Sequence, residues 1–163
     1  MTRWVFIGVM IALSVGLVFA QDEGEGDDTI KAEELGKDLK KHIGMGHTFR
    51  DVIAHIYRDL KQYPGYMKFD TANVRCRFAV PDREDWKLID MWGRGEIDDI
   101  RGLSKRFKDK NLQLLWEVFF GEIRPQVLSI SGKVVEPPES GGFGFLHIFD
   151  VTEIERVKYK SRQ

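Results

Sequence analysis

The stretch DREDWKLIDMWGRGEIDDIRGLSKRFKDKNLQLLWEVFFGEIRPQVL, residues 82–128, holds the densest run of apolar residues at helical spacing in the chain. Three of the four tryptophans lie in this stretch. A large aromatic side chain buries roughly 150–250 Å² when it enters a core. We therefore expect residues 82–128 to supply the core of a small domain.

Three helices are expected inside this stretch. Asp82 is placed to cap the first helix, which should end near Trp92 because the glycines in 93–95 are unfavourable within a helix. The second helix is predicted over 96–107 and the third over 111–122. All three should turn their apolar residues toward a common core.

The third of these helices is the most apolar. Its apolar stripe is wider than a helix on a protein surface needs, which favours either a position at the centre of the core or cover by a partner. The candidate partner or ligand surface consists of Leu114, Trp116, Val118, Phe119 and Phe120.

The flanking regions predict two more helices and a few strands. Helices are expected over 30–43 and over 48–60, the latter capped by Thr48 and carrying an apolar stripe from Phe49 to Leu60. Residues 72–80 alternate between apolar and polar side chains, which is typical of a half-buried strand. Arg75 and Arg77 should share its solvent-facing side, either to grip an anion or, as is more common for an outward arginine pair, to protect the strand edge or aid solubility. Two further strands are expected over 127–135 and 145–151, and Thr152 should cap a short charged tail.

These elements predict the fold class. We expect an α+β protein, a helix-rich single domain over residues 30–163 with a small antiparallel sheet. In this arrangement two N-terminal helices precede the sheet, and the three-part helical block of 82–128 packs on it.

The N-terminus predicts a signal peptide over residues 1–20. Arg3 supplies a positive charge, Trp4 to Phe19 form an apolar run, and small residues precede a cleavage point after Ala20. Residues 21–29 are acidic and glycine-rich, and we expect them to form a disordered tail. The expected location is therefore outside the cell or in the lumen of the endoplasmic reticulum.

The sequence predicts no catalytic, cofactor or metal site. Cys76 is the single cysteine, so no disulfide can form within the chain, and its neighbours favour a small apolar residue on the inner face of a strand. Asp51, His55 and Asp59 would share one side of the helix expected over 48–60, but the usual zinc pattern places two histidines at that spacing. We therefore expect a protein that is not an enzyme and needs no cofactor.

The charge balance argues against nucleic acid as a partner. The 163 residues contain 25 Lys and Arg and 26 Asp and Glu, for a net charge of −1. Proteins that bind nucleic acid carry a basic patch that neutralises phosphates. We expect a protein partner instead, either alone or within a membrane complex, and a lipid is the other candidate.

Residues 48–128 resemble the N-terminal luminal region of the chloride channel CLIC-like family, which consists of endoplasmic-reticulum membrane proteins linked to anion conductance. The matching motifs are Phe49-Arg50 with Ile53 and Ile56, Phe69-Asp70-x-Ala72, Ile97-Asp98-Asp99, Trp116 with Phe119 and Phe120, and Pro125-x-Val127-Leu128. The chain departs from the family in lacking its luminal cysteines and in the polar residues that follow Leu128. The resemblance implies a luminal domain associated with a membrane complex.

Two functions follow from these observations. The first is a non-enzymatic interaction domain of the secretory pathway, resembling the luminal part of that anion-channel family without its membrane spans. The alternative is a secreted carrier of a lipid or small apolar ligand, with the wide apolar helix around Trp116 lining its cavity.

Overall fold

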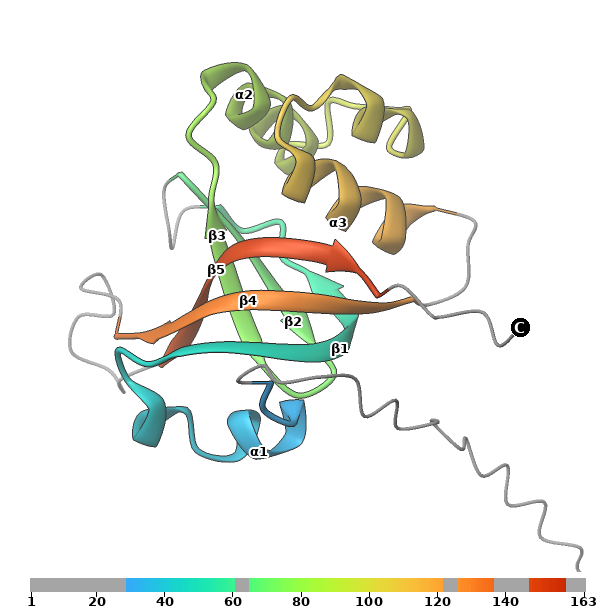
Figure 1. Ribbon diagram of the computed structural model, residues 1–163. Coiled ribbons are helices and arrows are strands. Elements are labelled where there is room, and N and C mark those ends of the chain that lie inside the picture. Colours follow the sequence, from blue (N-terminus) through green and yellow to red (C-terminus); the bar gives the residue numbers. More distant parts are fainter. Residues whose placement is uncertain (1–28, 61–64, 122–125, 137–146, 158–163) are drawn as a thin grey trace, which may run out of the picture.

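In the computed structural model, which describes residues 29–60, 65–121, 126–136 and 147–157, five strands close into a barrel (Figure 1). The strands are β1 (Gly46–Ile56), β2 (Tyr66–Thr71), β3 (Arg75–Ala79), β4 (Val127–Val135) and β5 (Ile148–Arg156). Their order around the barrel is β1, β2, β3, β5, β4, and β4 pairs with β1 to close it. The β3–β5 pair is parallel and the other four pairs are antiparallel.

The expected fold class, a helix-rich α+β domain with a small antiparallel sheet, is wrong. The sheet is mixed and closed, and strands make up 38% of the described residues against 34% for helices. The helical elements are α1 (Ala32–Lys37), α2 (Arg83–Gly93), α3 (Lys110–Phe120) and the 3₁₀ turns η1 (Leu39–His42) and η2 (Arg101–Arg106). The barrel, rather than the helical block, is thus the body of the protein.

The largest error concerns β1, which the sequence pattern predicts as part of a helix over 48–60. Its register against β2 shifts just after Ile53, where the strand bulges. Buried side chains alternate before the bulge, at Phe49 and Asp51, and the next buried side chain after it is Ile56. Because a bulge adds one residue to one strand, the apolar residues acquire mixed spacings that imitate a helical stripe.

The buried Asp51 makes the alternation of β1 still harder to recognise in the sequence. The residue is only 8% exposed. It accepts hydrogen bonds from the backbone N–H of Val52 at 2.8 Å and from the backbone and side-chain nitrogens of Asn73 at 2.9 and 3.1 Å. These bonds tie β1 to the turn between β2 and β3, so a charged residue occupies an inward position where the pattern leads one to expect an apolar one.

The helical block contains two of the three expected helices. Helix α2 confirms the expectation for 82–92, and the Asp82 side chain caps it by accepting from the backbone N–H groups of Glu84 and Asp85. Helix α3 confirms the expectation for 111–122, although it ends at Phe120. The helix expected over 96–107 is wrong, because only the short 3₁₀ turn η2 forms there.

Helix α3 packs against β1 and β5, while α1 and η1 lie on the opposite side of the barrel (Figure 1). Leu112, Leu115 and Trp116 are fully buried beneath it. The indole N–H of Trp116 donates to the carbonyl oxygen of Ile100 at 2.8 Å, which satisfies its polar atom inside the core.

The ends of the chain depart from expectation in two places. The helix expected over 30–43 is split into α1 and η1 at Asp38, whose φ of −150° is not helical. The strand expected over 127–135 is confirmed as β4. Strand β5 continues through Thr152 to Arg156, so the prediction that Thr152 caps a short charged tail is wrong. The signal peptide of 1–20 and the acidic tail up to residue 28 lie outside the described residues.

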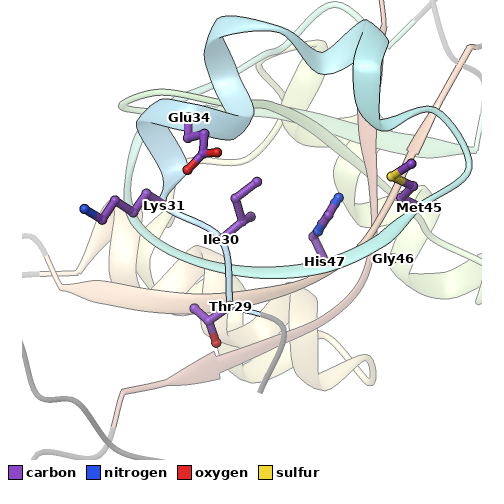
Figure 2. A pocket seen from close by; sticks show the side chains of 7 residues that line it. All are labelled: Thr29, Ile30, Lys31, Glu34, Met45, Gly46 and His47. Atoms are coloured by element: carbon purple, nitrogen blue, oxygen red, sulfur yellow. The ribbon is translucent and has the colours of Figure 1, made fainter. Parts of the chain in front are cut away.

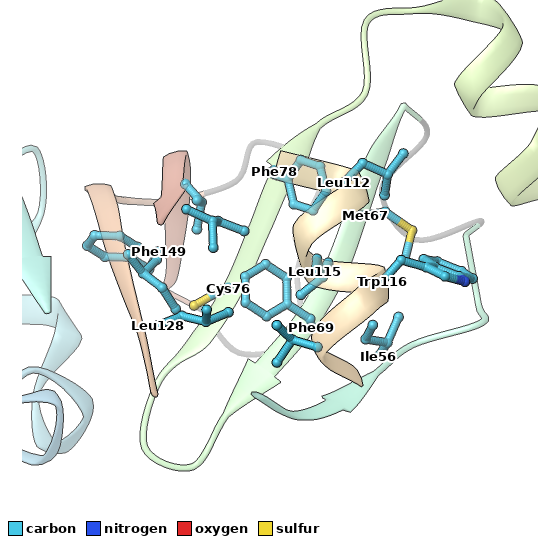
Figure 3. Packing of buried hydrophobic residues seen from close by; sticks show 14 of the residues in the cluster. Ile56, Met67, Phe69, Cys76, Phe78, Leu112, Leu115, Trp116, Leu128 and Phe149 are labelled. Atoms are coloured by element: carbon cyan, nitrogen blue, oxygen red, sulfur yellow. The ribbon is translucent and has the colours of Figure 1, made fainter. Parts of the chain in front are cut away.

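The barrel interior is filled by side chains that alternate along the strands (Figure 3). Phe49 and Phe149 meet edge to face with ring centroids 5.0 Å apart, and Phe69 and Phe78 do so at 6.1 Å. Cys76 lies among them with no exposure, which confirms its expected place on the inner face of a strand. Burial raises the pKa of its thiol well above the usual range, so the sulfur is held neutral.

Strand order and the position of α3 together identify the architecture. A five-stranded barrel in the order 1-2-3-5-4, with a helix between the third and fourth strands packed on the barrel, is the arrangement of the OB-fold. Known OB-folds bind oligonucleotides and oligosaccharides on the outer face of their second and third strands and with the loops that join strand 1 to strand 2 and strand 4 to strand 5. That face is therefore the first place to look for a functional site.

Candidate functional site: a charged outer face of the barrel

The outer side of β2, β3 and β5, together with Tyr57 directly after β1, carries a group of polar and aromatic side chains that we call the charged face. Successive side chains of a strand point to opposite sides. Those that alternate with the buried Met67, Phe69, Cys76 and Phe78 must therefore point outward. The charged face consists of Tyr57, Tyr66, Lys68, Asp70, Arg75, Arg77 and Asp150.

Strand register places the members of the charged face beside one another. Lys68 on β2 is opposite Arg77 on β3, and Arg77 is in turn opposite Asp150 on β5. One row further along, Asp70 on β2 is opposite Arg75. Cross-strand neighbours of this kind have Cβ atoms about 4.5–5.5 Å apart, so the face is continuous across three strands.

Asp70 connects the side chains of one half of the charged face, Tyr57 and Arg75. The hydroxyl of Tyr57 donates to its Oδ2 at 2.5 Å, and the guanidinium Nε of Arg75 lies 3.7 Å from its Oδ1. The hydrogen bond to Asp70 raises the pKa of Tyr57, because an ionised phenol would lose the bond and face a carboxylate. The side chains of Arg75 and Asp70 are 40% and 27% exposed, so both can reach a ligand.

Arg77 connects the side chains of the other half, Tyr66 and Asp150. Its Nε lies 3.5 Å from Oδ1 of Asp150, and its guanidinium carbon lies 4.1 Å from the ring centroid of Tyr66. A guanidinium over an aromatic ring is held by the quadrupole of the ring. Arg77 is only 5% exposed. Its main role is therefore to hold Tyr66 and Asp150 in position, rather than to contact a partner directly.

Lys68 lies between the two halves. Its ammonium is 4.2 Å from the ring centroid of Tyr57. Burial, and then the positive charge of Arg75, lower the pKa of Lys68. The charged face therefore presents two tyrosine rings and both signs of charge in fixed positions, which suits recognition of a polar partner by hydrogen bonding and ring contact.

The sequence pattern predicted only part of this face. It placed Arg75 and Arg77 outward on the strand over 72–80, as an anion grip or as protection of a strand edge. Tyr66, Lys68 and Asp70 were missed although they alternate with apolar neighbours, because no strand was assigned to that segment. Asp150 could not be found, since its partner Arg77 is distant in sequence.

The surface expected on α3 is distributed differently from the prediction. Trp116 is fully buried and Val118 is 8% exposed. Leu114, Phe119 and Phe120 are partly buried and pack against the core. Trp116 and Val118 thus contribute to the interior, and the other three residues are only partly buried.

The three residues considered as metal ligands, Asp51, His55 and Asp59, differ in their surroundings. Asp51 is buried in the barrel, while His55 and Asp59 are exposed. The described residues contain no group of three or more His, Cys, Asp or Glu placed to hold a metal ion. Every helix that the structure describes is too short or too polar to cross a membrane.

Comparison with known proteins adds little to this geometry. No family model matches the chain, and no curated protein is similar to it. Among solved structures it is similar to an OBody bound to hen egg-white lysozyme, with 16% identity, coverage of 84% of this chain and 99% of that chain, and a TM-score of 0.39. The OB-fold assignment accordingly rests on strand order and on the place of α3.

Proposed function

We propose that this protein is a non-enzymatic binding module of the secretory pathway that recognises a protein partner through the charged face. The observation that carries the proposal is the fixed set of tyrosine and arginine side chains where an OB-fold barrel binds its ligands. Tyr and Arg are enriched among the residues that dominate protein–protein binding. The N-terminal apolar run supports a place in the secretory pathway.

The charge of this face supports a protein over a nucleic acid. Lys68, Arg75 and Arg77 are balanced in part by Asp70 and Asp150, which lie within ion-pair range of two of them. A phosphate backbone is bound by uncompensated positive charge. A protein surface, in contrast, offers groups of both signs and can complement such a mixture. The resemblance of 48–128 to a luminal channel domain supports a membrane complex as the home of that partner.

Photo-crosslinking tests the proposal directly. Ala79 lies at the exposed end of β3 opposite Tyr66, so benzoylphenylalanine placed there samples the charged face without removing any of its members. In secreting cells we expect one discrete protein adduct from this position, identified by mass spectrometry. The matched control places the same group at Lys105, which is exposed on η2, an element that packs on α3.

Arg75→Glu then separates recognition from mere proximity. We expect it to lower the Ala79 adduct by about tenfold or more, since charge reversal at an interface arginine removes attraction and adds repulsion. Equal adducts from Ala79 and Lys105, or no effect of Arg75→Glu, would contradict the proposal. Salt-sensitive binding of a single-stranded oligonucleotide to the face would also contradict it.

A carrier of a lipid or small apolar ligand is the second candidate. It is favoured by Leu114, Phe119 and Phe120, which lie only partly buried on α3. Mass spectrometry of an organic extract of the purified protein distinguishes the two functions. A lipid present in equal amount to the protein favours the carrier, and a lipid-free protein that forms the Ala79 adduct favours the binding module.

A further inference from the structure

Two of the four histidines meet on the side of the barrel opposite α3. His42 ends η1 and His47 is the second residue of β1. Nδ1 of His42 lies 3.0 Å from Nε2 of His47, with ring centroids 4.8 Å apart and planes at 76°. The rings thus point a nitrogen of each toward the same small region of space, and both side chains are partly exposed.

The backbone between them holds this approach in place. Gly44 adopts a φ of +77°, and the N–H of Met45 donates to the carbonyl oxygen of His42 at 3.0 Å, so the chain reverses within the segment 42–47. The N–H of Gly44 donates to the carbonyl oxygen of Val134 on β4 at 2.8 Å. The turn is therefore anchored to the barrel, and the two imidazoles are positioned by rigid elements.

Met45 adds a third donor. It is 53% exposed although methionine is normally a buried residue, and it lines the same surface pocket as His47. Met45 directly precedes β1, two residues before His47, and both side chains face this pocket. Figure 2 shows both side chains beside Gly46, which has no side chain to separate them.

We propose that His42, Met45 and His47 bind a monovalent copper ion. Imidazole nitrogens ligate metals at about 2.0–2.1 Å, so two nitrogens 3.0 Å apart can contact one ion. Soft thioether sulfur selects Cu(I) among the metals that imidazole accepts. All three donors are neutral when they ligate.

The donor set argues against zinc. Structural zinc is bound by four protein ligands from Cys, His, Asp and Glu. The described residues offer no group of even three such side chains. The thioether completes the set for copper but is not among the usual zinc ligands, so the site is expected to prefer Cu(I). This inference does not rest on the function of the charged face, which is built from β2, β3 and β5.

Competition titration tests the site. Untagged protein, purified as produced from the full-length sequence, is titrated with Cu(I) under ascorbate in the presence of bicinchoninate. We expect one ion per chain. His47→Gln should lower the affinity by about a hundredfold and Met45→Leu by about tenfold, while Met45→Leu changes Zn(II) binding by less than about twofold. His55→Gln and Met91→Leu are the matched controls, because both residues lie outside the site.

Folding and ligand identity are checked separately. Circular dichroism confirms that each variant is folded, and His42→Gln serves if His47→Gln is not. X-ray absorption should show a sulfur scatterer that Met45→Leu removes. The proposal is overturned if the protein binds no Cu(I), if binding survives both histidine substitutions, if His55→Gln causes the same loss, or if the sulfur scatterer persists in Met45→Leu. A hydrogen-bonded histidine pair without metal affinity would be the remaining explanation of the 3.0 Å contact.

Discussion

Besides the phenylalanine pairs inside the barrel, aromatic rings form two further groups in the described part of the chain, and the surroundings of these two groups differ. In the aromatic cluster, Trp92, Phe107, Trp116, Phe119 and Phe120, the rings contact one another, with centroids 4.7–5.9 Å apart. In the charged face, Tyr57 and Tyr66 contact Lys68 and Arg77 instead. The first arrangement removes apolar area from water and stabilises the fold. The second keeps ordered charges at the surface, where a partner can reach them.

The comparison predicts the largest stability effect inside the aromatic cluster. Trp116→Ala should lower the free energy of unfolding by about 3–5 kcal/mol, because it empties a fully buried site. Urea unfolding followed by circular dichroism measures this loss. The folded fraction should still form the Ala79 adduct. If Trp116→Ala leaves stability unchanged but abolishes the adduct, the assignment of the two regions is reversed.

A buried carboxylate should have the next largest effect. Asp85 has no exposure and accepts from the backbone N–H of Lys108 at 2.9 and 3.1 Å and from that of Asp109 at 2.9 Å. Asp85→Ala leaves these donors unpaired and should lower the free energy of unfolding by about 2–3 kcal/mol, as measured by urea unfolding. Glu84→Ala, one exposed residue away, should cost less than about 0.5 kcal/mol. Equal losses in the two variants would show that Asp85 does not hold the start of α3.

Gly132 on β4 lies close to Phe149 of the barrel interior and to Asp150 of the charged face. A Cβ at this position would lie 2.2 Å from the carbonyl oxygen of Asp150 and 2.9 Å from the ring of Phe149. Gly132→Ala should therefore lower the free energy of unfolding by about 1–3 kcal/mol through overpacking. It should also weaken the adduct, since Asp150 must move. A fully stable variant would contradict the close approach of β4 and β5.

The hydrogen bond between Tyr57 and Asp70 predicts a pH dependence. The pKa of Tyr57 is raised from 10.0, so the stabilisation is present at neutral pH and disappears as pH rises through the raised value. Tyr57→Phe should cost about 0.5–1.5 kcal/mol at pH 7. The difference between the two proteins should shrink above about pH 10 in urea unfolding at several pH values. A difference that is constant with pH would indicate that the phenol proton is not shared with Asp70.

The smallest stability effect belongs to Arg75→Glu. Because the side chain is 40% exposed and its ion pair with Asp70 is long, the free energy of unfolding should change by less than about 0.5 kcal/mol. The Ala79 adduct should nevertheless fall as described above. A large loss of stability would mean that Arg75 belongs to the framework rather than to the recognition surface.

The sequence pattern predicted elements whose periodicity is local and uninterrupted. Helices α2 and α3 have regular stripes and aspartate caps, and β3 and β4 show alternation. Strand β1 was predicted as a helix because its bulge and the buried Asp51 break the period of two. Once β1 is a strand, four antiparallel pairs and the parallel β3–β5 pair close the barrel, and this closure has no local signature in the sequence.

The candidate site was harder to predict for the same reason. Arg75 and Arg77 were placed outward by alternation, but their partners Asp70 and Asp150 are assigned only by strand register. The apolar stripe of α3 predicted either a place at the centre of the core or cover by a partner, because the width of a stripe does not reveal whether a barrel lies beneath it. Trp116 faces that barrel and is fully buried.

Hydroxyl-radical footprinting of the protein with and without its crosslinked partner tests the central claim most directly, because one experiment reports on aromatic residues of both regions. We predict that the partner protects Tyr57 and Tyr66 from oxidation and leaves Phe119 and Phe120 unchanged. Protection of Phe119 and Phe120 with unaltered oxidation of the two tyrosines would contradict recognition by the charged face.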